Sequence, residues 1–121
     1  WTTVSNNPKI IFDAAHNLAG FKCISSQLDK TKYNQLHVIL AFIKGKNITE
    51  LISTLPLNSY MYYTSINMER GMTQSEIIQN VGRSIIFDEN PKRLLDTVKD
   101  HCSDQDVILI TGSNFIAKSI L

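Results

Sequence analysis

Short apolar runs alternate with helical patterns along the whole chain, and this alternation limits the fold more than any other feature. The runs are rich in β-branched and aromatic residues, which is typical of strands buried on both faces. They predict strands at Lys9–Phe12, Gln35–Phe42, Tyr60–Thr64, Ser84–Phe87 and Val107–Ile110. Strands that alternate with helices predict an α/β fold with a mostly parallel sheet, because each crossover helix brings the chain back to the same edge.

Each interval after a predicted strand carries apolar residues at helical spacing. Thr73 is followed by Glu76 at the spacing of a capping box, and Asn90 is followed by a proline, so both mark helix starts. Residues that commonly cap helices mark four expected starts: Asn17, Thr73, Asn90 and Asn114. The pattern predicts a three-layer Rossmann-like domain, with a sheet of five or six strands between helices.

Length and charge place the chain among ordinary globular domains. Its 121 residues suit a single domain, and its net charge of +1 gives no electrostatic reason to expect nucleic acid or an anionic membrane as a partner. Cys23 and Cys102 lack metal-ligand spacing and are expected to be buried free thiols in a reducing cytoplasm. Because the sequence begins at Trp1, we expect an excised domain of a larger protein.

Polar side chains follow two of the predicted strands directly. Asp13-Ala-Ala-His16-Asn17 ends the first, and Thr111-Gly-Ser113-Asn114 ends the last. Ligands of open α/β sheets bind at the carboxyl ends of strands, so the two segments are expected to meet in one site. The chain has neither the glycine pattern of a dinucleotide site nor a P-loop, and it lacks the clustered carboxylates and the lysine of a receiver domain.

Four motifs in order resemble the C-terminal domain of folylpolyglutamate synthases, within the Mur ligase superfamily. Asp13-Ala-Ala-His-Asn17 resembles their D-x-A-H-N motif, and Gly45-Lys46-Asn47 occupies the place of a D-K-D motif but lacks both acids. The segment Thr64–Gly71 resembles one that carries an arginine, here Arg70, and Ile110–Ser113 resembles a G-S motif.

The resemblance implies an ATP-dependent ligase that adds glutamate to the γ-carboxylate of a folate. It implies that a central ATPase domain outside this sequence holds the P-loop, ATP and Mg²⁺, so the isolated chain is expected to be a monomer without activity. On this resemblance Asp13, His16 and Asn17 are expected to contact the nucleotide. Lys46, Arg70 and Ser113 are expected to hold the incoming glutamate.

Simpler interpretations of the same residues remain open. Asp13 and Asn17 are also good helix caps, and Arg70 next to Glu69 could form a surface ion pair. The chain could instead be a Mur-type peptidoglycan ligase domain or an α/β binding module without catalysis. Residues assigned to structural roles are His37, His101, Tyr60, Tyr62 and Tyr63.

Overall fold

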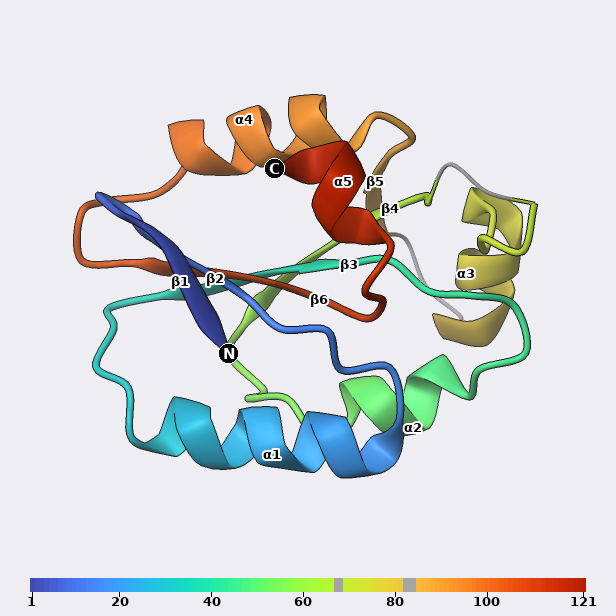
Figure 1. The fold of residues 1–121 in the computed structure, drawn as a ribbon, viewed down its shortest axis with the longest axis horizontal. Coiled ribbons are helices and arrows are strands. Elements are labelled where there is room, and N and C mark those ends of the chain that lie inside the picture. Colours follow the sequence, from blue (N-terminus) through green and yellow to red (C-terminus); the bar gives the residue numbers. More distant parts are fainter. Residues whose placement is uncertain (67–68, 82–84) are drawn as a thin grey trace.

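A six-stranded sheet lies between two layers of helices (Figure 1). The computed structural model describes residues 1–66, 69–81 and 85–121. The strands are β1 (Thr2–Asn6), β2 (Lys9–Phe12), β3 (Leu36–Leu40), β4 (Tyr60–Thr64), β5 (Ile86–Asp88) and β6 (Val107–Thr111). The helices are α1 (Leu18–Asp29), α2 (Ile48–Ile52), α3 (Gln74–Val81), α4 (Pro91–Asp100) and α5 (Ile116–Ile120).

The strand order is β1-β2-β6-β3-β4-β5, and only the pairing of β1 with β2 is antiparallel. Strand β6 is therefore inserted between β2 and β3. The helices that follow β2 and β3 cover one face of the sheet, whereas the helix that follows β6 lies on the other (Figure 1). The chain thus has its topological switch point around β6, which is where open α/β sheets bind ligands.

Two apolar cores explain why the layers hold together. On one face α1, α2 and α3 bury residues such as Phe21, Leu51 and Ile77 against the sheet. On the other face α4 and α5 bury Leu94 and Ile116 against it. Every residue of β3 and of β6 is buried, as continuous apolar runs in a parallel sheet predict.

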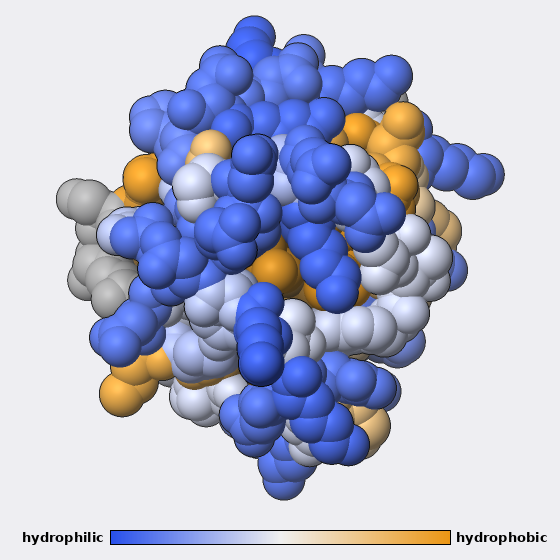
Figure 2. All heavy atoms as spheres, turned by 90° about the vertical axis from the view of Figure 1, so that its left-hand side faces the viewer, coloured by the Kyte–Doolittle hydropathy of each residue, from blue (hydrophilic) through white to orange (hydrophobic). Residues whose placement is uncertain are grey.

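The surface agrees with this arrangement of cores. Outside the atoms drawn in grey, the face in Figure 2 is mostly hydrophilic, with small apolar areas between polar side chains. Among the described residues, no helix combines the length and the apolar character needed to cross a membrane.

Most predicted elements are confirmed, but several details are wrong. The strand predicted at Gln35–Phe42 spans only Leu36–Leu40. The last helix begins at Ile116, and its N-cap position is Phe115 without a side-chain hydrogen bond, so Asn114 does not cap it. The strand predicted at Ser84–Phe87 is observed at Ile86–Asp88, while Ser84 lies outside the described residues. Cys23 is exposed rather than buried, because it lies two positions from buried Phe21 and so on the other side of α1.

The carboxyl ends of β2, β6 and β3 are joined at Gly112. The Gly112 N–H donates to Ala15 O at 3.1 Å, and the Ala41 N–H donates to Thr111 O at 3.3 Å. Gly112 has a φ of +107°, and a Cβ atom there would lie 2.3 Å from Ala41 O. Only glycine fits at this position without moving the backbone.

We expect Gly112→Ala to destabilise the chain more than Gly45→Ala. Gly45 also has a positive φ, of +88°, but a Cβ atom there would meet nothing within 4 Å. The free energy of unfolding of the control variant, Gly45→Ala, should therefore fall only by the cost of the unfavourable backbone conformation, about 1–2 kcal/mol. In Gly112→Ala the free energy of unfolding should fall by a further ~1–3 kcal/mol, because the new Cβ atom overlaps Ala41 O. Urea unfolding of both variants measures the difference, and equal losses would show that the close approach to Ala41 is unimportant.

Candidate functional site

The segment after β2 forms the first wall of the candidate site. The Asp13 carboxylate accepts a hydrogen bond from the Ala15 N–H at 2.9 Å, and its second oxygen lies 2.8 Å from the backbone nitrogen of Trp1. His16 is exposed, with Nδ1 3.3 Å from Ala14 O. Asn17 caps α1 by accepting the Gly20 N–H at 2.9 Å. His16 is therefore accessible at the switch point. Asp13 is partly exposed there, but both of its carboxylate oxygens already have partners, and the amide oxygen of Asn17 is occupied as a helix cap.

The segment after β6 forms the floor next to this wall. Ser113 is only 1% exposed, and its hydroxyl accepts the Phe115 N–H at 3.2 Å. The Thr111 hydroxyl donates to Ala15 O at 3.5 Å. Ser113 therefore lies at the predicted edge, but its side chain shapes the turn and is not open to solvent.

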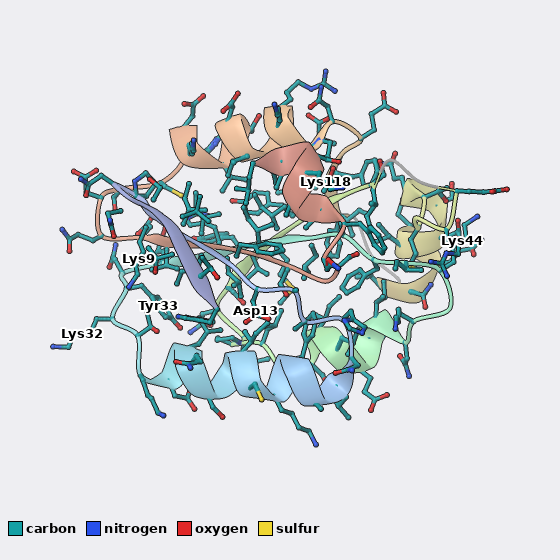
Figure 3. All side chains as sticks on the ribbon, viewed as in Figure 1. Lys9, Asp13, Lys32, Tyr33, Lys44 and Lys118 are labelled. Carbon is teal, nitrogen blue, oxygen red and sulfur yellow. The ribbon has the colours of Figure 1, made fainter. Side chains whose placement is uncertain are left out.

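The loops after β3 and β4 pair with each other and extend beyond the sheet. The Lys44 N–H donates to Arg70 O at 2.7 Å, and the Met72 N–H donates to Phe42 O at 2.9 Å. An antiparallel bridge joins Ile43 to Gly71 between these bonds. We call residues 42–47 and 69–72 the paired arm. Figure 3 shows Lys44 beside α3 and well away from Asp13.

The paired arm carries cations in different environments. Lys44 Nζ lies 3.6 Å from Glu76 Oε1. Burial raises the pKa of Glu76, but the hydrogen bonds from Thr73 and the charge of Lys44 outweigh this effect, so the pKa lies below its ordinary value. Lys46 and Arg70 form no ion pair within the described part of the chain, so the expected alternative of a Glu69–Arg70 pair is not observed there. These two cations are free to meet an anionic ligand.

A cavity of about 640 Å³ opens farther along the same edge, beside α4 and α5. Two glutamates, Glu69 and Glu89, line it together with Ser65, Asn90 and Ser119. Carboxylates in the wall repel an anion, so this cavity suits a dicarboxylate less well than the side chains of Lys46 and Arg70 do.

The structure therefore brings the predicted residues to one edge but not into one cluster. Asp13 and His16 lie at the switch point, and Lys46 and Arg70 lie on the paired arm, with Ser113 buried at the end of β6. The residues Asn67 and Met68 of the arginine segment lie outside the described residues. Sequence reasoning overlooked Lys44, although the pattern Lys44-Gly-Lys46 places two cations close together in one loop.

Comparisons with known proteins agree with this fold. A family model described as Mur ligase, glutamate ligase domain, matches residues 1–114. A dihydrofolate synthase/folylpolyglutamate synthase of Buchnera aphidicola subsp. Baizongia pistaciae is 31% identical over 114 residues, which are 92% of this chain and 27% of that protein.

Solved structures show the same fold at lower identity. A bifunctional folylpolyglutamate synthase/dihydrofolate synthase with Mn, AMPPNP and L-glutamate bound gives a TM-score of 0.85 at 18% identity, over 97% of this chain and 29% of that one. Mycobacterium tuberculosis folylpolyglutamate synthase complexed with ADP and AMPPCP gives 0.82 at 21% identity, over 93% and 28%.

The chain spans less than a third of the length of each of these proteins. The match to the family model nevertheless covers nearly all of its residues. The chain therefore belongs to the Mur ligase family and corresponds to its glutamate ligase domain.

Proposed function

We propose that this chain is the C-terminal domain of a folylpolyglutamate synthase, with or without dihydrofolate synthase activity. The complete protein would use ATP to join glutamate to the γ-carboxylate of a folate. The observation that carries the proposal is the convergence of the D-x-A-H-N segment, the cationic paired arm and the β6 turn on one edge of a domain of this family. The names of the relatives favour a folate over a peptidoglycan precursor as the acceptor.

The nucleotide would be shared between two domains. This chain has no P-loop, so the phosphates and Mg²⁺ would be held mainly by a central domain outside this sequence. ATP supplies the phosphoryl group that activates the acceptor carboxylate. His16 is exposed and Asp13 is partly exposed at the switch point, and both would contact the nucleotide when the domains close. Asn17 would support nucleotide binding indirectly. Its amide oxygen caps α1 and so fixes the start of the helix that follows His16.

The incoming glutamate would be held by its two carboxylates on the paired arm. The guanidinium of Arg70 matches a carboxylate as a bidentate fork, and Lys46 supplies a second positive charge. The backbone bonds between the two loops fix these side chains on one rigid support. Ser113 would contribute by holding the β6 turn in shape. Bound in this way, the amine of glutamate can face the activated carboxylate.

The proposed reaction is tested by incubating the complete protein with ATP, Mg²⁺ and labelled L-glutamate. We expect label to be added to tetrahydrofolate, forming its diglutamate, and also to dihydropteroate if the protein is bifunctional. We expect no label to enter a nucleotide-linked muramyl peptide precursor. A peptidoglycan ligase would add a different amino acid, so ATP-dependent transfer of another labelled amino acid, and not of L-glutamate, to the muramyl precursor would identify one. Absence of ATP-dependent transfer of any of these amino acids to every acceptor would favour a binding module.

We expect His16→Ala in the complete protein to raise the KM for ATP by roughly 10- to 150-fold, the effect of losing one hydrogen bond to a charged group. His16 is exposed and caps no helix, so the variant should fold normally. His101→Ala is the matched control, because His101 is also exposed but follows α4 near the opposite edge. Steady-state kinetics with varied ATP measure the effect. An unchanged KM for ATP in His16→Ala would exclude this nucleotide contact.

We expect Arg70→Ala to raise the KM for glutamate by roughly 10- to 150-fold while the KM for ATP changes little. Arg70→Lys should recover only part of the loss, because an ammonium cannot form the bidentate contact. Arg93→Ala is the control, since the Arg93 guanidinium is already bound to Asp88 by bonds of 2.6 and 2.7 Å. Initial rates at varied glutamate decide the matter. Equal effects in Arg70→Ala and Arg93→Ala would remove Arg70 from the site.

A further inference from the structure

Three side chains with metal-binding atoms meet at the amino end of the sheet, opposite the candidate site. They are His37 on β3, Cys102 just after α4 and Asp106 just before β6, and their ligand atoms all lie within 4.8 Å of one another. His37 and Asp106 are each 3% exposed, and Cys102 is half-buried. Among the described residues this is the one group of this kind. The proposed ligase reaction does not use it.

The spacing of the two buried residues suits a tetrahedral ion. Zinc bonds to histidine nitrogen and carboxylate oxygen of about 2.0–2.1 Å place such ligand atoms about 3.3 Å apart. His37 Nε2 and Asp106 Oδ2 are 3.2 Å apart. Cys102 Sγ lies within reach by a small movement, because its residue follows the end of α4 and is not in a helix or strand. Nitrogen, sulfur and oxygen ligands together are characteristic of zinc.

The atoms behind these ligands already have the contacts that metal sites need. The second ring nitrogen of His37, Nδ1, lies 3.1 Å from the Tyr62 hydroxyl. Asp106 Oδ1 accepts the Gln35 N–H and the Ser103 hydroxyl, each at 3.1 Å, and Oδ2 accepts the Ser103 N–H at 3.1 Å. Partners of this kind hold ligand side chains in place and set the histidine tautomer. The positions of His37 and Asp106 are therefore fixed before an ion arrives, and only Cys102 has to move.

We propose that His37, Cys102 and Asp106 form a binding site for one zinc-type divalent ion, with water as the fourth ligand on the side where Cys102 reaches the surface. On binding, the proton between His37 Nε2 and Asp106 moves to Nδ1, which then donates to the Tyr62 oxygen. The Cys102 thiol releases its proton to solvent. The ion would tie β3, β6 and the end of α4 together at this edge, independently of the proposed ligase reaction.

Cobalt(II) is the probe, because a thiolate bound to it gives a charge-transfer band in the near ultraviolet. The chain, reduced and stripped with a chelator, is titrated with CoCl₂. We expect the band in the wild type and in Cys23→Ser, with one cobalt per chain, and no band in Cys102→Ser. Cys23 is the matched control because it is an exposed free cysteine on α1. Cys102→Ser keeps the His37–Asp106 contact, so its fold should persist.

Tyr62→Phe tests the support behind His37 without removing a ligand. We expect it to keep the cobalt band but to weaken the affinity by roughly 10- to 100-fold. Absence of the band in both the wild type and Cys23→Ser would overturn the proposal and leave the cluster as a buried hydrogen-bond network. A band that persists in Cys102→Ser, or is lost in Cys23→Ser, would overturn it as well.

Discussion

The close contact of Gly112 with the backbone of Ala41 is the constraint on which the candidate site depends. It lets the turn after β6 lie against β3 while the same glycine donates to Ala15 after β2. Three strand ends from distant parts of the chain are thereby held at one edge. The D-x-A-H-N segment, the β6 turn and the base of the paired arm could not adopt a common geometry if a side chain separated these backbones. The contact thus links the fold to the proposed ligase chemistry.

The strands and most helix starts could be predicted because their signals are local. Apolar runs of four to eight residues predicted the strands, and Thr73 with Glu76 forms the expected capping box. The start of the last helix was wrong for a local reason too: the Ser113 hydroxyl takes the Phe115 N–H, and the helix begins only at Ile116. Asn114 was a good cap by type, but the turn at Gly112 sets where the helix can begin.

The site was predictable at the level of the sheet edge but not of the side chains. Parallel strands place their carboxyl ends together, so Lys46 and Arg70 were expected on one edge. The pairing of the two loops that carry these residues could not be predicted, because α2 and β4 separate Ile43 from Gly71 in the sequence. The burial of Ser113 and the contact of His37 with Asp106, 69 residues away in sequence, are likewise products of tertiary packing. Local sequence patterns do not predict such tertiary contacts.

The proposed ligase function requires that incoming glutamate bind the paired arm at the carboxyl edge. A crystal structure of the complete protein with a non-hydrolysable ATP analogue and L-glutamate tests it most directly. We expect the carboxylates of glutamate to contact Arg70 and Lys46, with the nucleotide near Asp13 and His16. Glutamate in the cavity beside Glu69 and Glu89, or away from this edge of the sheet, would contradict it.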